Sequence, residues 1–146
     1  MSETHKRQTQ RPSLVISFEG IEGVGKSTQV QLLAQTLLER GLSCIRTREP
    51  GGTSFGNQIR SCLLQEHDNA ILPQSELCLL LASRIDHWQH LVLPALEKGQ
   101  IVIIDRFIDA TVAYQGYGRQ LGAGFIEKIH RDLDLWHEPD MTFLLD

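Results

Sequence analysis

Four short apolar segments recur along the chain, and stretches long enough to hold a helix separate them. Segments such as IVII lack the polar alternation of a half-exposed strand, so they predict parallel strands that helices cover on both faces. The four predicted strands are Leu14–Phe18, Cys44–Thr47, Ile101–Ile104 and Met141–Leu145. Their order, with helices between them, predicts an α/β fold with an open parallel sheet.

Helical spacing of apolar residues marks the connections in the first half of the chain. Lys26–Arg40 carries leucines at helical spacing, and Gly41 follows it as a typical helix end. Thr53 or Ser54 can cap a shorter helix that runs to about Leu64. Both segments are therefore predicted to be helices.

Two further helices are expected in the second half of the chain. A long helix should begin at Pro73, whose fixed φ suits a first helical turn, and Pro94 should kink or end it. The segment Phe125–Trp136 places its large apolar residues on one predicted face and stops before Pro139.

Composition and charge narrow the class of protein. With 14 basic and 18 acidic residues the formal net charge is -4, which argues against nucleic-acid binding by bulk charge. The apolar segments are too short for a membrane span or a signal peptide, so we expect a cytoplasmic protein without a membrane partner.

Residues 1–12 are expected to form a flexible arm before one domain at residues 13–146. Because ligand-binding loops follow such strands, a last strand that stops at Asp146 leads us to expect a domain that is incomplete at its C-terminus.

The sequence GIEGVGKS lies directly between the first predicted strand and the first predicted helix, and it is a complete GxxxxGK[ST] motif. Glycines let such a loop curl so that its N–H groups point at phosphate oxygens, and the helix N-terminus adds positive charge. Lys26 is expected to reach the β- and γ-phosphates of ATP, and Ser27 to hold Mg²⁺. A glycine-rich turn that merely connects strand and helix is the structural alternative. The predicted phosphate-binding residues are Gly20, Ile21, Glu22, Gly23, Val24, Gly25, Lys26, Ser27 and Thr28.

Other classes of phosphate-loop protein need motifs that this sequence lacks. A regulatory GTPase needs an NKxD motif to recognise guanine, but the only asparagines, Asn57 and Asn69, are followed by Gln and Ala. The LSGGQ-like signature of transporter ATPases is also absent from the sequence. Kinases that act on small phosphate acceptors are therefore favoured.

A carboxylate and a guanidinium follow the third predicted strand, at the sheet edge where the phosphate loop also lies. Asp105 can hold Mg²⁺ directly or through water, and Arg106 can bind an acceptor phosphate with its planar set of donors. A structural ion pair between the two residues is the alternative.

Other polar residues favour a structural interpretation when they are taken singly. Arg48 opens a proline and glycine turn, and Arg60 and Arg84 indicate solvated helix faces. The histidines of the predicted helices are likewise expected on a helix surface or in an interface rather than on a metal: His87, His90, His130 and His137.

Taken together, these segments resemble bacterial thymidylate kinases. The resemblance runs from Leu14 to Asp146 through FEGIEGVGKST, TREPGGT, LASR, DRF and AYQGYGR, in the family's order and at compatible spacing. TREPGGT and the DRF…AYQG combination are specific to this family among phosphate-loop kinases. The resemblance implies the P-loop nucleoside monophosphate kinase fold and transfer of the γ-phosphoryl group of Mg·ATP to dTMP. It also implies a homodimer formed through the long central helix.

The resemblance assigns roles to individual residues. Arg48 and Arg106 would surround the acceptor phosphate, and Arg84 would hydrogen-bond the thymine base. Glu22 would lie close to the sugar and phosphate, and Tyr114 would lie against the deoxyribose. The implied catalytic set is Lys26, Arg106, Asp105 and Glu22, with Ser27 and Asp105 at the metal. The implied dTMP-binding set is Arg48, Leu80, Arg84, Arg106, Thr111, Tyr114 and Gln115.

The sequence departs from the family pattern in three places. Leu80 stands where the family usually has a phenylalanine that stacks on thymine, and Ala110 stands where a serine is usual. The chain also stops at Asp146, before the positions that would supply the lid and its arginines. Two alternatives stay open: a non-catalytic nucleotide-binding fragment, and a kinase of another nucleoside monophosphate such as dUMP.

Overall fold

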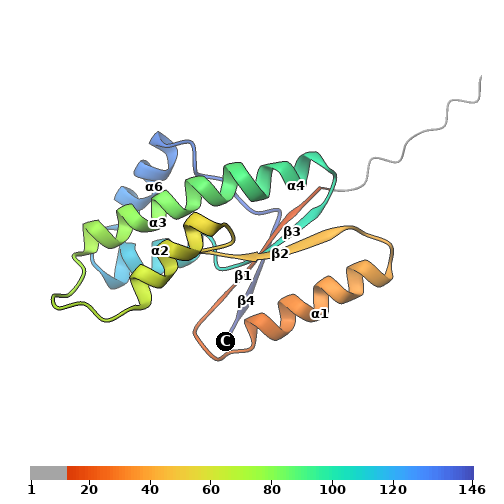
Figure 1. The fold of residues 1–146 in the computed structure, drawn as a ribbon, viewed down its shortest axis with the longest axis horizontal. Helices are drawn as coiled ribbons and strands as arrows, with labels where there is room; N and C mark the ends of the chain where they lie inside the picture. Colours follow the sequence, from red (N-terminus) through yellow and green to blue (C-terminus); the bar gives the residue numbers. More distant parts are fainter. Residues whose placement is uncertain (1–12) are drawn as a thin grey trace, which may run out of the picture.

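Four parallel strands form the centre of the computed structural model, which describes residues 13–146 (Figure 1). They are β1 (Val15–Gly20), β2 (Cys44–Arg48), β3 (Ile101–Asp105) and β4 (Met141–Leu145), in the spatial order β2-β3-β1-β4. Each neighbouring pair is parallel, which confirms the predicted sheet. The expected arm at residues 1–12 lies outside the described residues.

Helices cover both faces of this sheet, as the unbroken apolar strands predict. Figure 1 shows α1 (Lys26–Glu39) on one side, with α2 (Ser54–Leu64), α3 (Pro73–His87), α4 (Leu93–Glu97) and α6 (Ala123–Asp132) on the other. Within residues 13–146, none of the helices has the length and apolar character needed to cross a membrane. The elements after β2 are α2 (Ser54–Leu64), α3 (Pro73–His87), the π-helical turn η1 (Trp88–Val92), α4 (Leu93–Glu97), α5 (Ile108–Thr111), the π-helical segment η2 (Val112–Gly118) and α6 (Ala123–Asp132).

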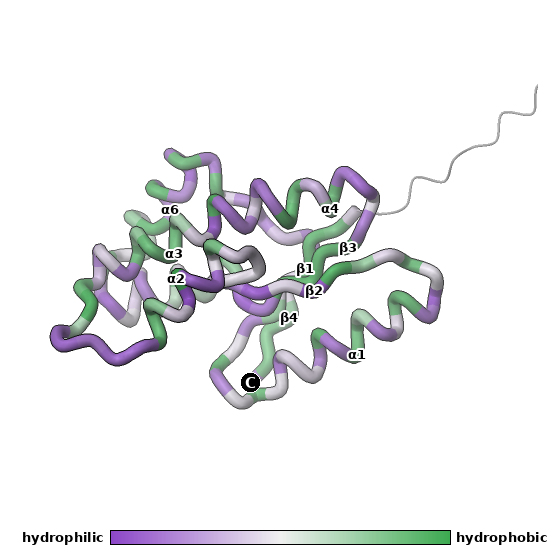
Figure 2. The backbone as a smooth tube through the Cα atoms, in the orientation of Figure 1, coloured by the Kyte–Doolittle hydropathy of each residue, from purple (hydrophilic) through white to green (hydrophobic). Residues whose placement is uncertain are grey.

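The central strand β3 explains why the run IVII contains no polar residue. Ile103 belongs to the core cluster that includes Val30 of α1, whereas Ile104 belongs to the cluster that includes Val92 of η1. All of Ile101–Ile104 is buried, because each face of the strand has its own helical cover. Figure 2 shows this arrangement, with the hydrophobic stretches of β1 and β3 at the centre of the fold.

Pro94 is expected either to kink or to end the long helix that begins at Pro73, and the structure shows that it does not end it. The helix passes through η1 and continues as α4, with Pro94 in the first turn of α4. In η1 the N–H of Leu93 bonds to the carbonyl of Trp88, the wider spacing of a π-helix. Because a wider turn precedes Pro94, its missing N–H and its ring are accommodated without a break.

The predicted helix Phe125–Trp136 is wrong at its C-terminal end, because α6 stops at Asp132. Asp134 has a left-handed backbone with φ of 54°, and such a residue turns the chain away from a helix. The N–H of Leu135 then bonds to the carbonyl of His130 at 2.7 Å and closes the helix end.

The predicted apolar face of α6 is wrong in part. Ile129 packs against the core cluster that contains Ile126, but two other residues of that face do not. Phe125 and Leu133 are 48% and 44% exposed, whereas Ile126 and His130 are fully buried. Ile126 packs with Leu77 and Leu81 of α3, so α6 turns this face toward α3. The expectation that His130 lies on the helix surface is therefore also wrong.

Candidate active site

The order of the strands creates a crevice at the carboxyl edge of the sheet. β1 and β3 are neighbours, but the chain leaves β1 toward β2 and leaves β3 toward β4, on opposite sides. Ligands of open α/β sheets bind where two connections diverge in this way. The predicted phosphate loop follows β1 and the Asp105–Arg106 pair ends β3, so both lie at this crevice.

The phosphate loop is bent at glycines whose conformations other residues rarely adopt. Gly20 has φ of 139°, and a Cβ there would lie 2.3 Å from the carbonyl oxygen of Leu145. Gly25 has φ of 100° and immediately precedes α1. The first N–H groups of α1, which have no partner within the helix, therefore begin directly at the loop.

Lys26 is buried inside this loop. Its side chain is 7% exposed, and its Nζ donates hydrogen bonds to the carbonyls of Gly20 and Ile21 at 2.9 and 2.7 Å. A buried ammonium with neutral partners adds a positive charge to the N–H groups of the loop. The arrangement is therefore suited to an anion.

Ser27 and Asp105 meet beside the loop and fit a hard divalent cation. The hydroxyl of Ser27 lies 3.4 Å from Oδ2 of Asp105. The other oxygen, Oδ1, is buried and has no hydrogen-bond partner within residues 13–146. Hydroxyl and carboxylate oxygens are ligands that Mg²⁺ accepts, usually with phosphate and water in its remaining positions.

A cavity of about 330 Å³ lies in front of the loop, and three arginines face it. Arg48 and Arg106 were expected here. Arg60 was not expected, because its place on a helix indicated a solvated face. Arg60 lies four residues after Gly56, which is buried, so the two residues share one face of α2. The spacing of Arg60 from that glycine could have indicated that it does not lie on the solvated face. Partial burial and the charge of Arg48 lower the pKa of Arg60.

The chain passes Arg106 in a left-handed conformation that non-glycine residues rarely adopt, with φ of 67°. Two hydrogen bonds hold this segment: the Arg106 N–H donates to the carbonyl of Phe18 at 2.9 Å, and the Phe107 N–H donates to Oε1 of Glu19 at 2.7 Å. Glu19 is 5% exposed, and burial raises its pKa to about 7. The buried carboxyl of Glu19 therefore anchors the backbone that presents Arg106.

The side chain of Arg106 lies over Tyr114. Its Cζ is 5.2 Å from the ring centroid, and its Nη1 donates to the tyrosine hydroxyl at 3.2 Å. Two contacts of this kind limit the orientations of the guanidinium.

A second cavity, of about 490 Å³, adjoins the first. The second cavity is lined by all the predicted acceptor residues except Arg48, and also by Ala110. Arg48 faces the first cavity. Glu22, Arg60 and Arg106 line both cavities. The predicted residues in the second cavity are Glu22, Leu80, Arg84, Arg106, Thr111, Tyr114 and Gln115.

Arg84 is 5% exposed, so its interpretation as a solvated helix residue is wrong. Its Nε donates to Oε2 of Glu49 at 2.6 Å, and its Nη2 donates to the hydroxyl of Thr111 at 3.0 Å. The guanidinium also lies 5.3 Å from the ring centroid of Phe107. Although burial alone would raise the pKa of Glu49, Arg84 and His87 hold it below its ordinary value.

His87 belongs to the same buried network, contrary to the surface expectation. It is fully buried, with Nδ1 2.8 Å from Oε1 of Glu49 and Nε2 2.7 Å from the hydroxyl of Thr47. The two oxygens of Glu49 are thus shared between Arg84 and His87. Burying the carboxylate is tolerated because both oxygens have partners.

Gln115 has its amide orientation set by a carboxylate. Its Nε2 donates to Oε1 of Glu76 at 2.7 Å, and Arg119 donates to Oε2 of Glu76 at 2.6 Å. A carboxylate only accepts, so the amide nitrogen of Gln115 must face Glu76. The amide oxygen of Gln115 is then the atom left for a donor on a ligand.

Comparison with known proteins agrees with this geometry. The family model described as thymidylate kinase matches residues 18–146. A thymidylate kinase of Neorickettsia sennetsu is 48% identical over 132 residues, which are 90% of this chain and 65% of that protein. A thymidylate kinase of Chlorobaculum tepidum is 50% identical over 133 residues, which are 91% of this chain and 62% of that protein. The chain thus spans less than two thirds of the length of these curated relatives.

The fold is also similar to that of a solved relative. The crystal structure of thymidylate kinase from Ehrlichia chaffeensis matches with a TM-score of 0.84 and 40% identity, over 92% of this chain and 73% of that chain. This likeness confirms the expected α/β fold of the P-loop nucleoside monophosphate kinase type.

Proposed function

The chain belongs to the thymidylate kinase family, and we propose that it transfers the γ-phosphoryl group of ATP to dTMP, giving dTDP and ADP. One observation supports this proposal above the others. The phosphate-loop cavity and the larger cavity share the side chains of Glu22, Arg60 and Arg106. A nucleotide whose base occupies the larger cavity therefore presents its phosphate to arginines that also face the loop.

In the proposed reaction the loop between β1 and α1 binds the phosphates of ATP. The N–H groups of the loop and of the first turn of α1 donate to phosphate oxygens, and Lys26 adds a full positive charge. Ser27 and Asp105 would hold Mg²⁺, which when bound neutralises charge on the phosphates.

The acceptor nucleotide is proposed to lie in the larger cavity. Arg60 and Arg106 bind its phosphate there, with Arg48 on the adjoining side. Tyr114, held by Arg106, lies against the deoxyribose. Among the residues that line this cavity but not the phosphate-loop cavity, Arg84, Thr111 and Gln115 supply polar contacts to the base, and Leu80 supplies an apolar contact.

Transfer then needs little covalent chemistry from the protein. An oxygen of the dTMP phosphate forms a bond to the γ-phosphorus, while the bond from the γ-phosphorus to the bridging oxygen of ADP breaks. Lys26, Arg60 and Arg106 lie around the place where the two phosphates meet. Catalysis is therefore expected to come from positioning and from stabilisation of charge.

We also propose a homodimer in the cytoplasm, with ATP and dTMP as the small-molecule partners. The dimer would form through α3 and the adjoining α2, because Phe55 and Ile85 expose 49% and 41% of their surfaces on these helices. The net charge of -4 gives no support to a nucleic-acid partner.

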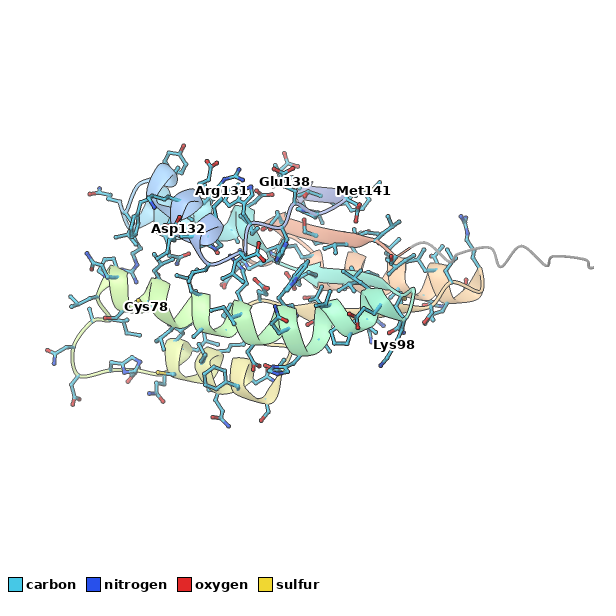
Figure 3. The ribbon with its side chains drawn as sticks, turned by 90° about the horizontal axis from the view of Figure 1, so that it is seen from above. Cys78, Lys98, Arg131, Asp132, Glu138 and Met141 are labelled. Carbon is cyan, nitrogen blue, oxygen red and sulfur yellow. The ribbon has the colours of Figure 1, made fainter. Side chains whose placement is uncertain are left out.

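The proposal is tested by measuring dTDP after incubation of the purified protein with Mg·ATP and dTMP. Replacing Arg106 by alanine should lower the rate about a hundredfold or more while ATP binding persists, because Arg106 faces the transferred charge. Arg131→Ala is the matched control, since Arg131 is exposed on α6 (Figure 3), where it pairs with Glu127 and lies over the Trp136 ring, and it lines neither of the two cavities.

Two outcomes contradict the proposal. If the protein binds ATP and dTMP but forms no dTDP, it is a nucleotide-binding module and not a kinase. If dUMP is phosphorylated much faster than dTMP, the reaction is correct but the acceptor is not.

A further inference from the structure

His130 has no role in the proposed reaction, yet it touches the side chain proposed to recognise the base. Figure 3 shows α6, which carries His130, beside the first half of α3 near Cys78. The imidazole of His130 is fully buried, and its Nε2 lies 2.6 Å from Nη1 of Arg84. Its other nitrogen, Nδ1, lies 2.7 Å from the carbonyl oxygen of Ile126.

These two contacts each specify the same protonation state for His130. A backbone carbonyl only accepts, so Nδ1 must carry the proton. A guanidinium only donates, so Nε2 must present its lone pair to Arg84. The neutral imidazole with the proton on Nδ1 satisfies both partners, whereas an imidazolium would place an N–H against an N–H of Arg84.

The charges around His130 favour this neutral state. Arg84 contacts it from α3, and the carboxylate of Glu49, in the segment after β2, lies on the other side of the Arg84 hydrogen bond and acts on it through its charge. The uncharged Trp136 ring lies nearly perpendicular to the imidazole, with the two ring centroids 6.1 Å apart. Burial and the charge of Arg84 lower the pKa of His130, against smaller opposing effects of Ile126 and Glu49. At neutral pH the imidazole is therefore an acceptor and not a charge.

The hydrogen bonds of Arg84 leave few donors for a ligand. A guanidinium has five N–H groups. Glu49, His130 and Thr111 take one each, on three different nitrogens. The remaining donors are one N–H on each terminal nitrogen, and Arg84 lines the larger cavity.

From this arrangement, and resting on the function proposed above, we infer that His130 is a positioning residue for base recognition. It fixes the rotation of the Arg84 guanidinium so that the free N–H groups face a carbonyl oxygen of a pyrimidine base in the cavity. His130 does not touch the ligand. Its effect should therefore reach ligands that carry a base and spare ligands that carry only the sugar phosphate.

The test compares two substitutions with opposite expectations. His130→Gln keeps an acceptor near the position of Nε2, whereas His130→Leu keeps a similar volume without an acceptor. Calorimetric titration should show dTMP binding weakened about ten- to a hundredfold by His130→Leu. Arg84 then no longer holds the rotation in which it donates to the base, and a lost hydrogen bond between a charged group and the ligand has this magnitude. His130→Gln should restore most of that affinity. Lys128→Ala, on the exposed side of α6, is the control.

Deoxyribose 5-phosphate separates positioning from a general structural effect. Its affinity should be the same in the wild type and in His130→Leu, because it has no base. Equal weakening of dTMP and deoxyribose 5-phosphate would overturn the inference, and so would unchanged dTMP affinity in His130→Leu.

The wild-type protein supplies a measurement that needs no variant. Nitrogen NMR of the histidines should show His130 as the neutral tautomer protonated on Nδ1, both free and with dTMP bound. An imidazolium, or a proton on Nε2, would overturn the inference. If dTMP binding depends on His130 as described but dTDP is not formed, the inference stands and the proposed kinase function fails. No binding of dTMP by the wild type would overturn both.

Discussion

Glu19 provides a measurable link between the buried site and the stability of the fold. Its carboxyl is 5% exposed and accepts a hydrogen bond from the Phe107 N–H. Burial raises its pKa from 4.5 to about 7, with a smaller contribution from Asp109, and the Phe107 N–H opposes this rise. The folded protein therefore binds the Glu19 proton more tightly than the unfolded chain does.

The raised pKa fixes the sign of the pH dependence. Stabilisation by the Glu19 proton is fully present below pH 4.5 and is lost as the pH rises through about 7. At about 1.36 kcal/mol per pKa unit, the free energy of unfolding should fall by about 2.5 kcal/mol between about pH 5 and about pH 8 because of this one group. Glu19→Gln should remove that dependence, because an amide keeps the acceptor for Phe107 but does not titrate in this range.

Urea unfolding at several pH values, followed by tryptophan fluorescence, measures this difference. Subtracting the wild-type free energy of unfolding from that of Glu19→Gln at each pH removes the effects of the other titratable groups. This difference should rise by about 2.5 kcal/mol from about pH 5 to about pH 8. Glu66→Gln, at an exposed glutamate, should show no such change. A difference between Glu19→Gln and wild type that is independent of pH would refute the reasoning.

Three further substitutions test the proposed acceptor site. Arg60→Ala should raise the KM for dTMP about tenfold or more, because a charged phosphate contact is lost; an unchanged KM in steady-state kinetics would place Arg60 outside the site. Leu80→Phe should tighten dTMP binding by about fivefold or more through stacking on the base, and weaker binding by calorimetry would show that the cavity lacks room for the ring. Glu76→Gln should lower the preference for dTMP over dCMP about tenfold, because the amide of Gln115 can then turn over; an unchanged ratio of kcat/KM values would contradict this role of Glu76.

The sheet could be predicted because its signal is local. Ile101–Ile104 shows no alternation, and both of its faces are covered in the structure. The last turns of α6 could not be predicted in this way. Helical spacing continues through Leu133 and Trp136, but the chain leaves the helix at the left-handed Asp134. A backbone conformation of that kind leaves no trace in hydrophobic periodicity.

The residues of the candidate site could be predicted where they are contiguous in sequence, but not where their partners are distant in sequence. The phosphate loop is contiguous in sequence, so its residues could be named from the motif and its context. Glu19 and Phe107 are 88 residues apart, and Arg84 and His130 are 46 residues apart. A charged or polar residue in a helical pattern predicts a solvated face unless its partner is known, because burial without a partner is unfavourable.

The buried network around Arg84 is better explained by the orientation of its guanidinium than by stability of the fold. An ion pair such as Arg84–Glu49, with both side chains almost fully buried, gains little stability over an apolar pair, because desolvation offsets the attraction. Removing one partner alone is expected to cost about 3–5 kcal/mol, since the other charge is then left buried and unpaired. Stability therefore explains poorly why a charge should be buried here. Orientation explains it better, because acceptors on three nitrogens and the Phe107 ring together hold one rotation of the guanidinium toward the cavity.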